Sequence, residues 1–314
     1  MGRAAQWAAV VSTVTGLVVA CGGSSTPSGF NGDDGGKDAT GGGPDGSQGA
    51  DDSSGGDDGS QVFPDSGMPP PKDSGPPPQV AVVYAHSPDT LYKLDPTTNK
   101  LSVVGPFSGG CVTVIDIAID ANSNGYVTTF TGFYKVDLKT AVCTHIADGG
   151  YPNSLSFVPK GTLDPNTEAL VGYNGPQYLR IDTTTGAITN VGTGLTGGYA
   201  SSGDIVSVIN GGTFLTVTGP TCTTGDCLLQ VDPKTGSMIQ NYGSTGHPAI
   251  YGLAFWAGTA YGFDDGGEIF SIGVKNNMIV TVNIPVMAGL EFYGAGSTTA
   301  APPKSEDGGG IPIQ

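Results

Sequence analysis

Three acidic residues in short apolar segments are this chain's best candidates for acid–base chemistry: Asp116, Asp204 and Glu291. Ser154 occupies the comparable place in a fourth apolar segment. A pair of carboxylates can hydrolyse a glycosidic bond, and the distance between them determines whether the sugar configuration is retained or inverted. However, the acids recur irregularly, and no partner that would tune their pKa values can be read from the sequence. Catalysis is therefore the less favoured interpretation.

A possible calcium ligand set lies at Asp120, Asn122 and Asn124, before Gly125. Oxygen ligands at alternate positions before a glycine resemble the start of an EF-hand loop. The twelfth position of that loop is Thr131 rather than Glu. Because Asn-Gly is also a strong hairpin signal, a simple turn is the favoured interpretation and a weak calcium site is the alternative. We expect no other metal or cofactor.

Four cysteines follow Cys21, and the chain has three histidines. They are Cys111, Cys143, Cys222 and Cys227, and His86, His145 and His247. An even number of cysteines in an exported protein predicts disulfides, with three possible pairings. Cys222 and Cys227 bound a short loop that a local bridge could clamp, and Cys111 then pairs with Cys143 by elimination. Zinc at Cys222 and Cys227 is disfavoured because the other cysteines and the histidines are scattered, and each histidine is expected to be structural.

A repeated phrase predicts the elements that position these residues. Five times, two apolar residues flank a polar one and precede Asp or Gly, at spacings of 42, 45, 50 and 41 residues, about one propeller blade each. The copies are Tyr92-Lys93-Leu94-Asp95, Tyr134-Lys135-Val136-Asp137, Leu179-Arg180-Ile181-Asp182, Leu229-Gln230-Val231-Asp232 and Phe270-Ser271-Ile272-Gly273. The alternation predicts a strand, and the Asp with its following Thr and Gly, Asn or Ala predicts a hairpin turn rather than catalytic or metal-binding groups.

A further apolar segment precedes four of the copies, and in three of them it contains Asp116, Ser154 or Asp204. The first copy lacks this segment, whereas a matching one, Gly289-Leu290-Glu291-Phe292-Tyr293, follows the last copy. A C-terminal strand that completes the first sheet would cover both edges of a closed ring. The sequence therefore predicts an all-β, five-bladed β-propeller of four-stranded blades over residues 80–300. The first polar residues of its innermost strands are expected to line the central channel.

The segment Tyr178-Leu179-Arg180-Ile181-Asp182-Thr183-Thr184-Thr185-Gly186 resembles the repeat of NHL- and YVTN-type propellers. The resemblance covers essentially all of residues 80–300 and implies a fold without a single activity. The sequence has no nucleophile elbow, P-loop, HExxH or dinucleotide motif. Trp256 is the only tryptophan after the N-terminal signal, so the Trp-bearing repeats of quinone-dependent dehydrogenases and of the Trp-Asp type of propeller are not matched.

Residues 1–20 predict a secretory signal, because a single charge at Arg3 precedes an apolar stretch too short to span a membrane. The stretch ends Leu17-Val18-Val19-Ala20-Cys21-Gly22, which resembles the bacterial lipobox. The resemblance implies that Cys21 is lipidated and becomes the N-terminus, and that Gly22 directs the protein to the outer membrane. Ordinary export with Cys21 as a spare thiol is the alternative.

Residues 22–79 are almost entirely Gly, Ser, Asp, Pro and Thr, with ten Asp against two Lys. These residues and the lipidated cysteine, residues 21–79 together, are expected to form a disordered linker. A segment of this composition cannot bury enough apolar surface to fold. Residues 301–314 are expected to be a disordered tail. The net charge is −16 and no basic stripe exists, so nucleic acid is not an expected partner.

These features predict an exported, lipid-anchored and monomeric propeller of the bacterial envelope, facing the periplasm or the cell exterior. It is expected to bind a protein or glycan without catalysis. The first alternative is a carboxylate-based glycan hydrolase that uses Asp116, Asp204 and Glu291, and the second is a purely structural envelope protein. Residues 192–228 and 159–168 are the expected interface.

Overall fold

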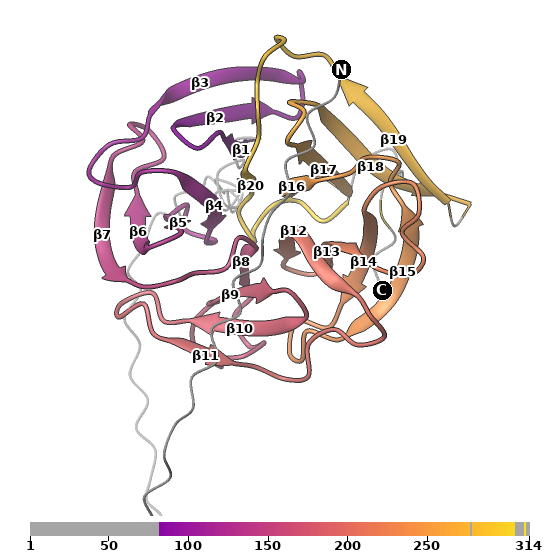
Figure 1. Ribbon diagram of the computed structural model, residues 1–314, viewed down its shortest axis with the longest axis horizontal. Coiled ribbons are helices and arrows are strands. Elements are labelled where there is room, and N and C mark those ends of the chain that lie inside the picture. The colour runs from indigo at the N-terminus through magenta and orange to yellow at the C-terminus, as the bar shows by residue number, and fades with distance from the viewer. Residues whose placement is uncertain (1–81, 277, 305–310, 312–314) are drawn as a thin grey trace, which may run out of the picture. The chain divides into compact units, whose positions relative to one another are not determined.

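The computed structural model describes residues 82–276, 278–304 and 311. The expected signal peptide, Cys21, the Asp-rich linker and most of the expected tail lie outside this part of the chain. The described residues form five four-stranded antiparallel sheets around a common axis (Figure 1), as predicted for a five-bladed propeller. In these ranges no helix has the length and apolar character needed to cross a bilayer.

Each blade runs from an innermost strand at the axis to an outermost strand at the rim (Figure 1). Blade 1 comprises β20 (Gly294–Gly296), β1 (Val83–His86), β2 (Thr90–Asp95) and β3 (Lys100–Pro106). Blade 2 comprises β4 (Val114–Ile119), β5 (Gly125–Thr129), β6 (Gly132–Val136) and β7 (Cys143–Asp148). Blade 3 comprises β8 (Leu155–Val158), β9 (Ala169–Asn174), β10 (Gln177–Ile181) and β11 (Ile188–Asn190). Blade 4 comprises β12 (Ala200–Val208), β13 (Gly212–Thr218), β14 (Cys227–Val231) and β15 (Met238–Ser244). Blade 5 comprises β16 (Ile250–Trp256), β17 (Thr259–Asp264), β18 (Ile269–Lys275) and β19 (Met278–Ile284).

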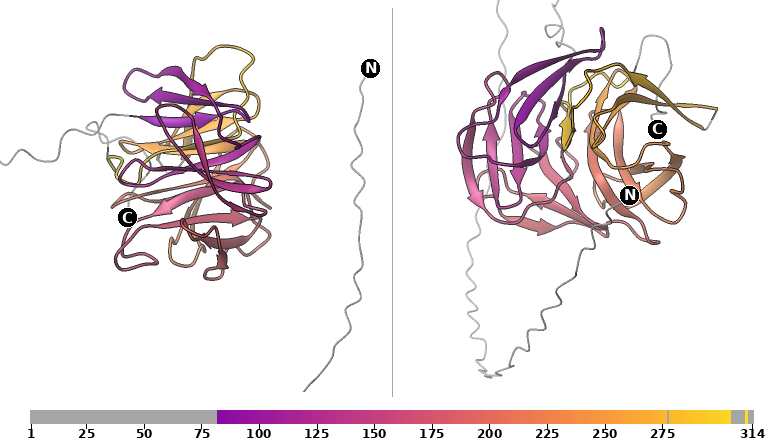
Figure 2. Two further views of the ribbon diagram at one scale, coloured as in Figure 1. Left: turned by 90° about the vertical axis from the view of Figure 1, so that its left-hand side faces the viewer. Right: turned by 45° about the horizontal axis from the view of Figure 1, so that its top comes forward.

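The ring closes where the last strand pairs with the first. β20 lies antiparallel to β1, with Ala295 opposite Ala85, and Figure 2 shows the yellow β20 beside the indigo first blade. Circular closure by a C-terminal strand is therefore confirmed. The strand begins at Gly294, however, and not within the expected segment 289–293. A Cβ at Gly294 would lie 2.3 Å from His86 Nε2, so the strand at this crowded position requires a residue without a side chain.

The repeated Asp residues form turns, as predicted. The Oδ1 atom of Asp182 accepts the main-chain N–H groups of Thr184 and Thr185 at 2.9 and 2.8 Å. These N–H groups lower the pKa of the Asp182 carboxyl, because they stabilise its charged form. The residue four places after Asp has a positive φ in four copies: Asn99, Ala141, Gly186 and Gly236. The repeated carboxylates therefore accept hydrogen bonds from the main-chain N–H groups of their own turns.

The turns also hold neighbouring blades together. Tyr151 follows the last strand of blade 2, and its hydroxyl donates to the Gly186 carbonyl in the turn of blade 3 at 3.0 Å. The Tyr173 hydroxyl of blade 3 donates to the Gly236 carbonyl in the turn of blade 4 at 2.7 Å. The repeated turn thus has a second role, as a contact between blades.

Both disulfides form, with the pairing that the sequence favours. Cys111 bonds to Cys143 and links the connection between blades 1 and 2 to the rim of blade 2. Cys222 bonds to Cys227 and clamps the loop between β13 and β14. Disulfides fit an exported protein, because reducing compartments keep thiols free.

Antiparallel strands alternate in direction, so the connections divide between two faces of the ring. We define the upper face as the one that carries the connections from each outermost strand to the next innermost strand, together with the β5–β6, β13–β14 and β17–β18 loops. The lower face carries the Asp turns and the segment after β20. There, the Thr298 hydroxyl donates to the Asp120 carbonyl, and the Ile209 N–H donates to the Thr299 carbonyl. Ala301 and Ile311, within the expected tail, are both buried.

Candidate functional site

The structure brings Asp116 and Asp204 together at the propeller axis, where both residues are fully buried. Asp116 accepts N–H groups from Ile117 and, across the blade boundary, from Leu155 at 2.6 Å. Asp204 accepts the corresponding groups from Ile205 and, in the next blade, Leu253, also at 2.6 Å. The two acids therefore tie together blades 2 and 3 and blades 4 and 5.

Burial raises the pKa of the Asp116 carboxyl well above its ordinary value, and the nearby charge of Asp204 raises it further. Burial also raises the pKa of Asp204, although main-chain N–H donors oppose that shift. Both buried carboxyls are therefore more easily protonated than an exposed Asp.

Other polar groups lie at the axis. The His86 ring is fully buried, and its Nδ1–H donates to the Ser87 carbonyl at 2.9 Å. The Nε2 atom of His86 and the hydroxyl of Ser154 have no hydrogen-bond partner among the described residues. Burial lowers the pKa of His86 to about 4, because the charged imidazolium would be desolvated. This histidine is structural and neutral, as expected.

Glu291 does not join the acids at the axis. Its side chain is exposed on the upper face, beside the turn between β17 and β18, where the Phe292 N–H donates to the Asp264 carbonyl. Glu291 therefore does not lie in an innermost strand, unlike the other two candidate acids. The strand β20 begins at Gly294, later than the sequence pattern indicates. Gly294 therefore occupies the position in β20 that corresponds to Asp116 in β4.

The possible calcium ligands form a turn on the lower face. The Asp120 carboxylate accepts the N–H groups of Asn122 and Asn124 through Oδ1, and the Asn124 side-chain amide through Oδ2 at 2.7 Å. A carboxylate with these internal partners needs no ion to satisfy it. Calcium binding at this turn stays a prediction.

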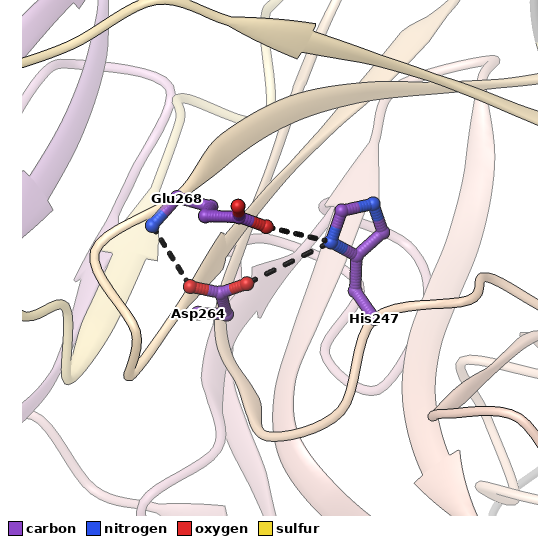
Figure 3. Close-up of side chains that lie close together, drawn as sticks. All are labelled: His247, Asp264 and Glu268. Atoms are coloured by element: carbon purple, nitrogen blue, oxygen red, sulfur yellow. Dashed lines mark hydrogen bonds and ion pairs between the residues drawn. The ribbon is translucent and has the colours of Figure 1, made fainter.

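A second group of titratable side chains lies on the upper face of blade 5 (Figure 3). His247, from the β15–β16 loop, points at Asp264, the last residue of β17, and at Glu268, just before β18. The His247 Nδ1 atom lies 3.3 Å from Glu268 Oε2 and 3.7 Å from Asp264 Oδ2. The side chain of Asp264 is 7% exposed and that of Glu268 is 56% exposed. Burial raises the pKa of Asp264.

Neighbouring elements fix the His247 group in place. The His247 ring stacks on Phe270, with centroids 3.6 Å apart. The loop that carries His247 is held by Asp226, whose N–H donates to the His247 carbonyl at 2.8 Å and whose carboxylate accepts the Ile250 N–H at 2.9 Å. Asp226 directly precedes Cys227, so the Cys222–Cys227 bridge constrains the residues that anchor this loop.

A depression of about 340 Å³ opens beside this group, between the β17–β18 turn and the β19–β20 loop. Glu268 lies on one side of it, and Pro285, Val286 and Met287 lie on the other. The Met287 side chain is 70% exposed, so it is accessible to a partner at the edge of the depression. This depression and the His247 group together form the candidate site.

No protein-family model and no curated protein matches the sequence. Among solved structures, a nidogen/laminin complex contains a chain that is 12% identical with a TM-score of 0.43, over 68% of this chain and 97% of that one. A protein of unknown function from Bacteroides caccae is 12% identical with a TM-score of 0.38, over 68% of this chain and 77% of that one. TolB from Acinetobacter baumannii is 15% identical with a TM-score of 0.39, over 66% of this chain and 51% of that one. At this similarity none of the three bears on the function of this chain.

The His247 group could not be predicted from the sequence. His247 lies 17 residues before Asp264, and Glu268 follows after four, so no short ligand motif joins them. The only local signal is the density of acids in Asp264-Asp265-Gly266-Gly267-Glu268. The fold of two separate loops was needed to bring the imidazole to these acids.

Proposed function

We propose that this chain is an exported, lipid-anchored binding protein of a bacterial envelope that recognises a protein partner through the upper face of blade 5. The depression of about 340 Å³ beside Glu268 carries this proposal. An exposed apolar side chain, Met287, faces it together with the carboxylate of Glu268. This combination suits a partner segment that presents an apolar residue next to a basic one.

A rigid ring supports such a role. The blades are joined by buried Asp–main-chain hydrogen bonds, and two disulfides brace the connection before blade 2 and the β13–β14 loop, so the loops of the upper face extend from a fixed scaffold. Preorganised loops reduce the entropic cost of binding. The lipobox-like end at Cys21 would place this scaffold at a membrane surface, on a linker that lets it reach partners.

The hydrolase alternative gains no support from the geometry of the acids. A general acid must come within hydrogen-bond reach of its substrate. Asp116 and Asp204 are fully buried and already accept main-chain N–H groups, while Glu291 lies apart from them. A glycan could not reach the buried pair without opening of the blades.

Site-specific photo-crosslinking tests the binding proposal. A photoreactive amino acid at Met287 is expected to yield a covalent adduct of defined mass in envelope fractions. The same substitution at Met278, which is 65% exposed on β19 but does not line the depression, is the matched control. An adduct at 278 equal to that at 287, or no adduct at either position, would contradict the proposal.

Membrane fractionation tests the anchor. Cys21→Ser is expected to move the protein from the membrane pellet to the soluble fraction and to abolish labelling by a fatty-acid analogue. If the variant stays with the membrane and keeps the label, lipid anchoring through Cys21 is wrong.

A further inference from the structure

We propose that His247, Asp264 and Glu268 form a binding site for a divalent transition-metal ion of the zinc type. The inference goes beyond partner binding, because the ion would bind to this chain alone. Each residue offers one ligand atom, and these three atoms all lie within 4.8 Å of one another. Figure 3 shows the three side chains converging, with one imidazole nitrogen of His247 facing the carboxylates of both Asp264 and Glu268.

The separations between ligand atoms fit a common ion. Zinc binds histidine nitrogen and carboxylate oxygen at about 2.0–2.2 Å, so two ligands at a tetrahedral angle lie roughly 3.3–3.5 Å apart. The His247 Nδ1 atom lies 3.3 Å from Glu268 Oε2 and 3.7 Å from Asp264 Oδ2. The Asp264 and Glu268 oxygens lie within 4.8 Å of each other, so side-chain adjustment to a similar separation would complete three of the four tetrahedral positions.

The types of ligand indicate the class of ion. One imidazole and two carboxylates suit zinc or a neighbouring first-row ion, whereas calcium takes six to eight oxygen ligands. Three protein ligands leave one position for water or for a donor from a binding partner. Because Glu268 also faces the depression, this free position would lie beside the proposed partner surface.

The group is not a set of satisfied hydrogen bonds. Within the described residues, the imidazole forms ion-pair contacts with both carboxylates but a hydrogen bond with neither. The Oδ1 atom of the buried Asp264 accepts the Glu268 N–H at 2.8 Å, whereas Oδ2 faces His247. The Oδ2 atom is not one of the fully buried, unpartnered polar atoms, so its remaining lone pairs are open to an ion.

The ligands are held in place by other contacts. Phe270 stacks under the imidazole, Asp226 fixes the main chain of His247, and the tight β17–β18 turn sets the separation of Asp264 and Glu268. Such fixed side chains need little reorganisation to bind an ion. The site is therefore preorganised by the fold rather than assembled by the metal.

Calorimetric titration of chelator-treated, full-length protein with Zn²⁺ tests the proposal, and Co²⁺ absorption reports the geometry. We expect one tight site per chain and the visible bands of tetrahedral Co²⁺. His247→Ala and Glu268→Gln should each raise Kd by about tenfold or more. Because the Glu268 side chain is 56% exposed, Glu268→Gln should fold normally. This keeps the test valid if His247→Ala misfolds.

Two matched controls distinguish this site from general attraction of cations. Asp265→Asn removes a neighbouring exposed carboxylate, and His145→Ala removes the exposed histidine that lies 2.9 Å from Asp148. Both should leave Kd within about twofold, since neither residue is a ligand. Absence of tight zinc binding, or equal losses in Asp265→Asn and Glu268→Gln, would overturn the site. The titration contains no partner, so its failure would leave the proposed binding function standing.

Discussion

The Oδ2 atom of Asp116 in blade 2 accepts a hydrogen bond of 2.6 Å from the main-chain N–H of Leu155 in blade 3. The same relationship recurs between Asp204 and Leu253, two blades further along the ring. Residues that the sequence places at the axis as possible catalytic acids thus join successive blades. Their contribution should therefore appear as stability of the folded ring.

Removal of the Asp116 carboxyl should destabilise the ring strongly. Asp116→Ala leaves the buried N–H groups of Ile117 and Leu155 without an acceptor, which should cost about 2–4 kcal/mol. Urea unfolding followed by tryptophan fluorescence measures this loss. Ser154→Ala is the control, because the Ser154 hydroxyl is also buried at the axis but has no partner there. Equal losses in the two variants would show that the inter-blade bonds contribute nothing.

His86 should make the protein less stable in acid. Its folded-state pKa, about 4, lies below the ordinary value of 6.5, so the unfolded chain binds more protons between these two values. The stabilisation is complete above pH 6.5 and is lost as pH falls toward 4, by up to about 3 kcal/mol. Urea unfolding between pH 7 and 4 should show a smaller loss for His86→Gln. An unchanged pH dependence in that variant would rule out His86 as the cause.

The two disulfides should contribute unequally. Cys111 and Cys143 are 32 residues apart and Cys222 and Cys227 only five, so loop entropy predicts about 4 kcal/mol for the first bridge and about 2 kcal/mol for the second. Unfolding of the Cys111→Ala/Cys143→Ala and Cys222→Ala/Cys227→Ala variants measures both. A larger loss from the short bridge would mean that its role in bracing the β13–β14 loop outweighs chain entropy.

Closure of the ring should depend on the absence of a side chain at residue 294. In Gly294→Ala the new methyl group would approach the His86 Nε2 and Asp116 Oδ1 atoms to 2.3 and 2.6 Å, which should cost about 1–3 kcal/mol. Gly150→Ala is the control, because a Cβ there meets nothing within 4 Å. Thermal unfolding compares the two, and a Gly294→Ala protein as stable as Gly150→Ala would contradict this account of closure.

The local part of the fold could be read from the sequence. An Asp turn such as that of Asp182 is decided by neighbouring N–H groups, so its chemistry appears in the repeat itself. The repeat register also placed Asp116 and Asp204 in innermost strands, β4 and β12. It did not place Glu291 there, because the pattern matches Gly289-Leu290 whereas the crowded position beside His86 and Asp116 is occupied by Gly294.

The sequence by itself determined the number of blades and closure of the ring by a C-terminal strand, and it favoured the disulfide pairing. These features depend on periodic and local patterns that a short segment carries whole. Only the tertiary structure decided that Asp116 and Asp204 are both fully buried with raised pKa values, and that His247 meets Asp264 and Glu268. Both groupings join side chains from different blades or loops, and such distances are set by the packing of the whole ring.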